Sequence, residues 1–112
     1  MDMGEYDQVI ADCNNLIKLD SSATEEAKAL NYLIKGTATM YKEDFESSIS
    51  DLNKSIQLNP NYGEAYSIRA IVYFSKKIYD KSWEDVHLAQ SLGGNIHPEF
   101  LESLKKESGR VK

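Results

Sequence analysis

The chain has 112 residues, with 13 lysines and arginines against 18 aspartates and glutamates, which gives a formal net charge of -5. This length suits one domain with a modest core and excludes large catalytic machinery, while the negative charge disfavours binding to nucleic acid and to anionic membranes. One cysteine, Cys13, cannot form a disulfide within the chain. The sequence shows neither an apolar run of membrane-spanning length nor a signal-peptide pattern, so we expect a soluble protein, cytoplasmic by default, without membrane insertion.

The first predicted helix runs from about Glu5 to Leu19. Apolar side chains recur along it at steps of three and four, which places them on one helical face. They are Tyr6, Val9, Ile10, Cys13, Leu16 and Ile17. Ser22 followed by Glu25 fits a capping box, in which each side chain satisfies a backbone N–H at a helix start. A second helix is therefore predicted to begin near Ala23.

The second predicted helix extends to Tyr41, and a polar turn at residues 42–44 separates it from a third helix that begins at Phe45. Asn59-Pro60-Asn61 ends the third helix, because proline lacks the backbone N–H that a helix needs and restricts the residue before it. The fourth helix follows and ends near Lys76 and Lys77, where positive charge suits the helix dipole.

The fifth predicted helix runs from Tyr79 to Leu92 and is stopped by Gly93 and Gly94. Pro98 suits the first position of a sixth helix, which Gly109 would end. The sequence shows no alternating apolar pattern or hairpin turn of the kind that a sheet needs. The chain is therefore predicted to be all-α.

One pattern occurs three times along these helices: an aromatic residue, an Asp six positions later and a Leu thirteen positions later. The copies are Tyr6, Asp12 and Leu19, then Phe45, Asp51 and Leu58, then Tyr79, Asp85 and Leu92. The second and third copies are 34 residues apart, which is the period of a helix-turn-helix solenoid repeat, and the first and second are 39 apart. Such repeats stack on one another and leave an extended surface for a partner.

Two stretches built on this pattern resemble the tetratricopeptide repeat (TPR) family, in which small residues let two helices approach and aromatics fill the gaps between helix pairs. The matching residues are Tyr32, Gly36, Phe45, Ser48, Leu52, Ser55 and Pro60, and then Tyr66, Ala70, Tyr73, Tyr79, Ser82, Ala89 and Gly94. The chain departs from the family at Gly94, where the family has proline, and at Glu43 and Lys77, where it often has glycine. The first copy also lacks the first helix of its pair.

The resemblance implies a right-handed helix-turn-helix solenoid. Residues 4–22 would form a half repeat, 23–60 and 61–94 two full repeats, and 95–112 a capping helix with its tail. Phe100, Leu101 and Leu104 would form the apolar side of the cap, which covers the last repeat. The first helix has no cap before it, so part of its apolar surface is expected to be exposed or covered by another chain.

In the TPR family, five positions of each first helix line a concave groove that binds a peptide. By that resemblance the peptide-binding residues are Leu30, Leu33, Ile34, Thr37 and Met40 in one repeat, and Glu64, Ser67, Ile68, Ile71 and Phe74 in the next. Most are apolar, which favours an apolar or amphipathic segment as the ligand. The alternative is that the register is shifted by one and several of these side chains belong to the core or to a self-association surface.

One TPR subgroup holds the C-terminal carboxylate of a chaperone with Asn, Lys and Arg. Here Ile34, Glu64 and Ile68 stand at those positions, and Glu64 would repel a carboxylate. The sequence therefore disfavours the co-chaperone function.

The sequence gives little support to a catalytic or metal-binding site. His87 and His97 lack metal-ligand spacing and are expected to be surface or capping residues. Asp12, Asp51 and Asp85 could suggest a carboxylate site, but their shared offset favours the same local polar contact made three times at the surface. Two further side chains are expected to be structural: Cys13 as an inert buried thiol, and Trp83 packed against the sixth helix, with an exposed interface role as its alternative.

These observations predict a non-catalytic protein–protein interaction module, with no cofactor and no metal. Its partner would be a protein or a peptide that the sequence does not identify. The alternative is a structural module that assembles with itself, as a dimer or an array, through the uncapped first helix.

Overall fold

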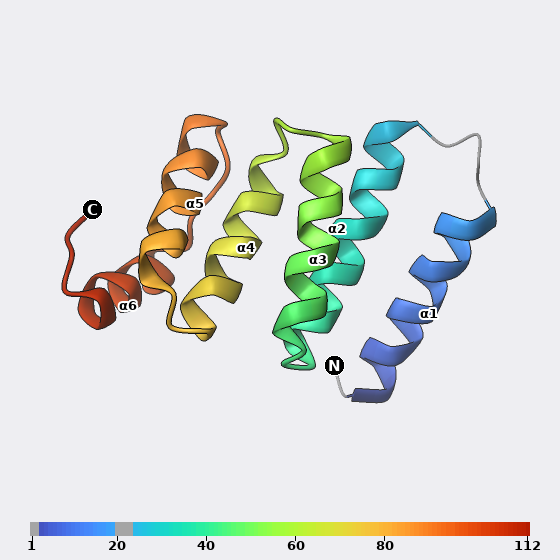
Figure 1. The fold of residues 1–112 in the computed structure, drawn as a ribbon, viewed down its shortest axis with the longest axis horizontal. Coiled ribbons are helices and arrows are strands. Elements are labelled where there is room, and N and C mark those ends of the chain that lie inside the picture. The colour runs from blue at the N-terminus through green and yellow to red at the C-terminus, as the bar shows by residue number, and fades with distance from the viewer. Residues whose placement is uncertain (1–2, 20–23) are drawn as a thin grey trace. The chain divides into compact units, whose positions relative to one another are not determined.

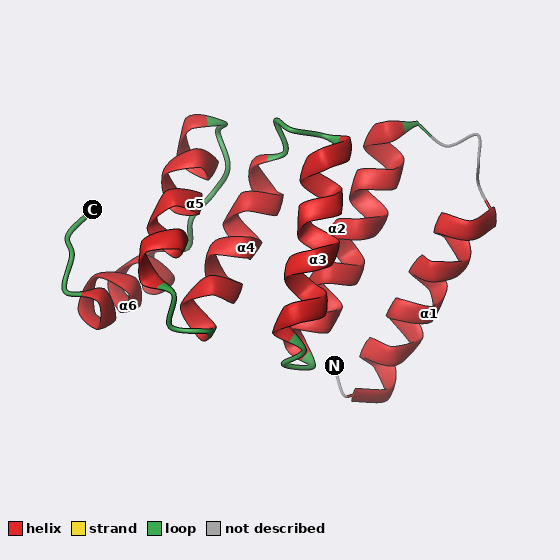
Figure 2. Cartoon of the chain, viewed as in Figure 1, coloured by secondary structure: helices red, strands yellow, loops and turns green. Residues whose placement is uncertain are grey.

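The computed structural model describes residues 3–19 and 24–112, and every regular element in these two ranges is an α-helix (Figures 1 and 2). The helices are α1 (Met3–Leu19), α2 (Glu25–Tyr41), α3 (Phe45–Leu58), α4 (Gly63–Ser75), α5 (Tyr79–Ser91) and α6 (Pro98–Ser108). The prediction of an all-α chain is confirmed. The chain divides into two compact units, Met1–Pro60 and Asn61–Lys112, and each is described by itself.

The helix ends follow the local signals that the sequence carries. Helices α3, α5 and α6 begin at the predicted residues, and Gly109 ends α6 with a φ of 72°, in the left-handed region that glycine favours. At α2, Thr24 is the N-terminal cap, and its side chain accepts a hydrogen bond of 3.1 Å from Ala27 N. The predicted cap at Ser22 and the predicted helix start at Ala23 lie outside the described residues.

The turn between α2 and α3 and the turn between α4 and α5 have the same conformation, 34 residues apart. Glu43 and Lys77 each have a φ of 63°. After each of them, a backbone N–H closes the turn at 2.9 Å, from Asp44 to Thr39 O and from Ile78 to Tyr73 O. At these two positions the repeat family that the sequence resembles often has glycine. The left-handed φ explains why glycine suits them.

Within each of these helical hairpins, small residues bring the two helices close together. A Cβ added to Gly36 would lie 3.0 Å from Leu52 Cγ, a tight contact that would require Leu52 to shift, so glycine suits this point. A serine on the second helix then reaches the backbone of the first. Ser48 Oγ donates to Gly36 O and Ser82 Oγ donates to Ala70 O, each at 2.7 Å. Each serine is buried, so these bonds also satisfy the hydroxyl groups.

Gly94 has a similar steric role at the end of α5. A Cβ at Gly94 would lie 3.1 Å from the carbonyl carbon of Gly63, at the start of α4. This tight contact of backbone with backbone favours glycine at this position.

In the second unit, α4, α5 and α6 share an apolar cluster. The buried cluster comprises Ala70, Trp83, Val86 and Leu104, and Phe100 and Leu101 pack against it. Trp83 Nε1 also donates to Ser108 Oγ at 3.0 Å. The predicted contact between Trp83 and the sixth helix is confirmed, as is the apolar side of that helix.

A glycine at the left-handed turn position should stabilise the protein. Lys77→Gly is expected to raise the free energy of unfolding by roughly 0.5–1 kcal/mol, because a residue with a Cβ is disfavoured at this φ. Lys77→Ala is the control, since it removes the same side chain and keeps the Cβ. Urea denaturation of both variants checks the prediction, which an equal effect of Gly and Ala would contradict.

Removal of the buried leucine of α6 should destabilise the second unit strongly. Leu104→Ala is expected to lower the free energy of unfolding by about 2–5 kcal/mol, because it leaves a cavity beside Trp83. Leu88→Ala, at an exposed leucine of α5, is the matched control and should change it by less than about 0.5 kcal/mol. Similar losses in the two variants, measured by thermal and urea unfolding, would show that α6 does not contribute to the core.

Candidate binding site

Helix α1 is attached to α2 at one end by aromatic and charged contacts. The rings of Tyr6 and Tyr41 stack with their centroids 5.4 Å apart and their planes 8° from parallel. Beside them, Lys42 Nζ forms an ion pair with the carboxylate of Asp7. Farther along α1, Cys13 is buried. These contacts fix α1 against α2 within the first unit.

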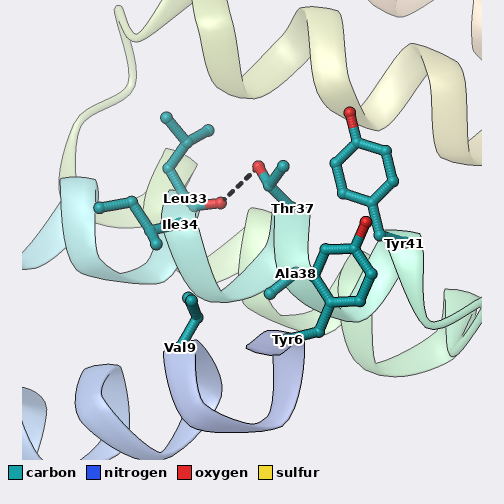
Figure 3. A pocket seen from close by; sticks show the side chains of 7 residues that line it. All are labelled: Tyr6, Val9, Leu33, Ile34, Thr37, Ala38 and Tyr41. Atoms are coloured by element: carbon teal, nitrogen blue, oxygen red, sulfur yellow. Dashed lines mark hydrogen bonds between the residues drawn. The ribbon is translucent and has the colours of Figure 1, made fainter. Parts of the chain in front are cut away.

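An open apolar cavity of about 520 Å3 lies between α1 and α2. Figure 3 shows its lining, with side chains that come from both helices. Tyr6 and Val9 belong to α1, while α2 contributes Leu33, Ile34, Thr37, Ala38 and Tyr41. The volume falls in the range of small-molecule and peptide side-chain sites.

The cavity offers a partner mainly methyl groups and aromatic rings. Its one aliphatic hydroxyl, on Thr37, donates a hydrogen bond of 2.8 Å to Leu33 O, drawn as the dashed line in Figure 3. The hydroxyl donor is therefore used within α2. Apart from Thr37, the two tyrosine hydroxyls are the polar side-chain groups of the lining. Such a surface favours apolar side chains of a ligand over a charged group.

Three of the five predicted binding residues of α2 line this cavity. Ile34 is 39% exposed and Thr37 is half-buried, while Leu33 is only 5% exposed and contributes to the core as well as to the cavity wall. Leu30 is exposed and Met40 half-buried on the same helix, but neither belongs to the lining.

The five predicted residues of α4 lie in the second unit. Two of them already contact their own unit: Ser67 Oγ donates to Gly63 O at 3.2 Å and to Asn95 O at 3.1 Å, and the ring of Phe74 meets that of Phe100 edge-on, with centroids 5.4 Å apart. The other three are Glu64, which is exposed, and Ile68 and Ile71, which are half-buried. A continuous groove over all ten residues stays a prediction.

Four residues of the lining were not predicted as binding residues: Tyr6, Val9, Ala38 and Tyr41. The sequence did carry a signal for two of them. Tyr6 and Val9 belong to the apolar stripe of the first helix, part of which was expected to be exposed or covered by another chain. Tyr41 stacks on Tyr6, and this contact depends on the tertiary fold.

Two of the three repeated aspartates form ion pairs with the preceding helix. Asp51 Oδ1 lies 3.3 Å from Lys35 Nζ. Asp85 accepts two hydrogen bonds from Arg69, at 2.8 Å from Nε and 2.7 Å from an η nitrogen. The repeated polar contact is thus present in both hairpins. The expectation of surface charges was wrong for Asp51 and Asp85, which are both buried, whereas Asp12 is exposed.

Burial shifts the ionisation of both carboxyl groups. Desolvation raises the pKa of Asp51 above its usual value, and Lys35 opposes this only partly. The second oxygen, Asp51 Oδ2, is buried without a hydrogen-bond partner among the described residues, which adds to the cost of the charged form. Burial also raises the pKa of Asp85, against the two bonds from Arg69.

The two histidines lie at a helix end and at the surface. His97 Nδ1 accepts a hydrogen bond of 3.3 Å from Glu99 N and caps α6, and His87 is exposed beside Trp83. No group of three potential metal ligands occurs in the part of the chain that the structure describes. Burial raises the pKa of the Cys13 thiol, which disfavours the reactive thiolate.

None of the helices in residues 3–19 and 24–112 combines the length and the apolar character needed to cross a membrane. No protein-family model and no solved structure matches the chain.

The raised pKa of Asp51 predicts a specific dependence of stability on pH. The folded state holds the Asp51 proton more tightly than the unfolded state. Protonation of Asp51 therefore stabilises the fold below the unfolded pKa, and this stabilisation is lost as pH rises through the folded pKa. Asp51→Asn removes this titration. The free energy of unfolding of the variant should therefore improve relative to the original protein between about pH 3 and about pH 7, by urea denaturation. If the free energy of unfolding of the variant instead falls relative to the original protein toward neutral pH, the ion pair with Lys35 outweighs the cost of burial.

Proposed function

We propose that this protein is a non-catalytic interaction module of the TPR type, which binds an apolar or amphipathic segment of a partner protein. The observation that carries the proposal is the open apolar cavity between α1 and α2. It brings three of the predicted binding residues together with side chains of a second helix, so a ligand there would contact two elements at once.

The repetition of the two hairpins supports the TPR part of this proposal. The turn at Glu43 and the turn at Lys77 share one backbone conformation, and Ser48 and Ser82 make the same bond to the preceding helix. These features recur at the 34-residue period of the sequence pattern. Units of this kind are the building blocks of helical solenoids, whose function is to present a binding surface.

The chemical character of the cavity supports binding rather than catalysis. Catalytic sites combine a nucleophile, a general base or a metal with groups that stabilise charge. The cavity lining has neither a histidine nor a carboxylate, and its threonine hydroxyl is engaged by the Leu33 carbonyl. Its apolar character suits the helix-in-groove mode of peptide recognition.

Self-assembly is the second candidate function, and exposed leucines on α1 favour it. Leu16 is 52% exposed and Leu19 is 83% exposed, so the C-terminal half of α1 offers an apolar surface that a second copy could cover. A mass that rises with protein concentration in analytical ultracentrifugation, and that Leu16→Glu returns to the monomer value, would establish this function instead.

Exchange of one cavity residue for a charged residue should abolish partner binding. Ile34→Glu places a carboxylate in the apolar cavity, and because Ile34 is exposed the variant should keep its helicity and melting temperature. Affinity capture from native extract, with mass spectrometry of the bound proteins, compares the two forms. A direct partner is expected to bind the original chain and to lose at least about tenfold in affinity for the variant.

The matched control is Leu88→Glu, which introduces the same charge at a leucine of α5 that is 43% exposed and lies outside the cavity. It should retain the partners. The same set of bound proteins for all three forms would place the binding surface elsewhere. An unfolded Ile34→Glu variant would show that Ile34 belongs to the core.

A further inference from the structure

We propose that one exposed side of α1 receives an α-helix of a partner protein, in the same way that α3 receives α2, and that this partner helix carries a basic residue directly followed by a small one. The open side of α1 is defined by Val9, Asp12 and Leu16. This inference rests on the proposed function, because it specifies the kind of segment that occupies the cavity.

The hairpin of α2 and α3 shows how the equivalent side of a helix is covered. Three polar side chains of α3, spaced by three and four residues, all contact α2. Ser48 Oγ donates to Gly36 O at 2.7 Å, Asp51 Oδ1 lies 3.3 Å from Lys35 Nζ, and Ser55 Oγ donates to Ala29 O at 2.7 Å. The covering helix therefore presents two small residues and one basic residue to α3.

The hairpin of α4 and α5 repeats this arrangement. Ser82 and Asp85 of α5 contact Ala70 O and the guanidinium of Arg69. At the other end of the interface, Gly63 takes the place of Ala29, and a Cβ added there would lie 3.6 Å from Ala89 O. Two independent hairpins thus use the same pattern, which is a small residue, a basic residue six positions later and a small residue at the seventh.

Helix α1 presents the corresponding positions. The repeated sequence pattern aligns Asp12 with Asp51 and Asp85, and the same alignment places Val9 and Leu16 at the positions of Ser48 and Ser55. Val9, Asp12 and Leu16 are spaced by three and four residues, as are their counterparts on α3, so their side chains lie on one side of α1. That side is open: Val9 lines the cavity, and Asp12 and Leu16 are exposed.

Asp12 differs from its two counterparts, which pair with Lys35 and Arg69. It accepts a hydrogen bond of 3.0 Å from Gln8, one turn earlier on the same helix, and within residues 3–19 and 24–112 it forms no ion pair. A helix seated on this side with a Lys or Arg at the position of Lys35 or Arg69 would complete the pair. The carboxylate therefore sets both the direction and the register of the incoming helix.

The two other positions indicate an occupant from a separate chain. Val9 and Leu16 replace serines that donate to the covering helix, so α1 offers apolar area where α3 offers hydrogen bonds. The covering pattern is Gly or Ala, then Lys or Arg six positions later, then Gly or Ala at the seventh position. This sequence contains it twice, starting at Ala29 and at Gly63. Both of those helices are already packed, on α3 and on α5. A second copy would have to release one of them, so a partner protein with this pattern is favoured.

A peptide with the sequence of residues 24–42 provides the probe, stapled between the positions of Ala27 and Asn31 to keep it helical and to leave the side of Ala29 and Gly36 free. Its affinity for the full chain is measured by fluorescence anisotropy. Asp12→Lys in the protein, or Lys35→Glu in the peptide, should each weaken binding about tenfold, and the two changes together should restore it. Leu16→Glu should weaken binding, and Leu88→Glu should not.

Three results would overturn the inference. The first is that the stapled peptide does not bind, and the second is that it binds with an affinity that Asp12→Lys and Leu16→Glu leave unchanged. The third is that the protein dimerises by itself through α1 and that Asp12→Lys returns it to a monomer. The proposed function is judged separately, by native partners that Ile34→Glu releases. Such partners without any dependence on Asp12 would retain the cavity as a binding site and refute the helix as its occupant.

Discussion

The close approach of the two helices in each hairpin is the constraint on which the rest of this structure depends. A Cβ on Gly36 would be in tight contact with Leu52, and at this separation Ser48 reaches the backbone of the facing helix. The same separation buries Asp51 beneath α2, where it needs a basic neighbour. One steric condition therefore accounts for a small residue, a hydroxyl group and an ion pair, and all three recur in the second hairpin.

The binding proposal follows from this constraint when it is applied to α1. Helix α1 carries the sequence pattern of α3 and α5, but its Asp12 and Leu16 are exposed, whereas Asp51 and Ser55 at the matching positions of α3 are buried. Its contacts with Tyr41 and Lys42 fix it to α2, while Val9 lines the open cavity and Leu16 is exposed. Apolar area of this kind, beside a carboxylate that forms no ion pair within the two described ranges, favours an amphipathic segment from another protein.

The sequence predicted the helices well because their boundaries depend on local chemistry. Pro98 and Gly109 mark the two ends of α6 through backbone preferences that no tertiary contact has to supply. The candidate site was harder to predict. Leu33, Ile34 and Thr37 came from a family resemblance, whereas Tyr41 enters the site through a ring contact with α1. Lys35 and Arg69 were missed as partners of the aspartates, although their own offset of 34 residues was present in the sequence.

Photo-crosslinking from inside the cavity tests the central claim most directly. A benzoylphenylalanine at position 34 would face the cavity between α1 and α2, and the same residue at position 88 would project from α5. In native extract, irradiation is expected to link a partner protein to position 34 and not to position 88, with the crosslinked peptide of the partner forming an amphipathic helix. Equal crosslinking from both positions, or crosslinking from position 88 alone, would contradict the account.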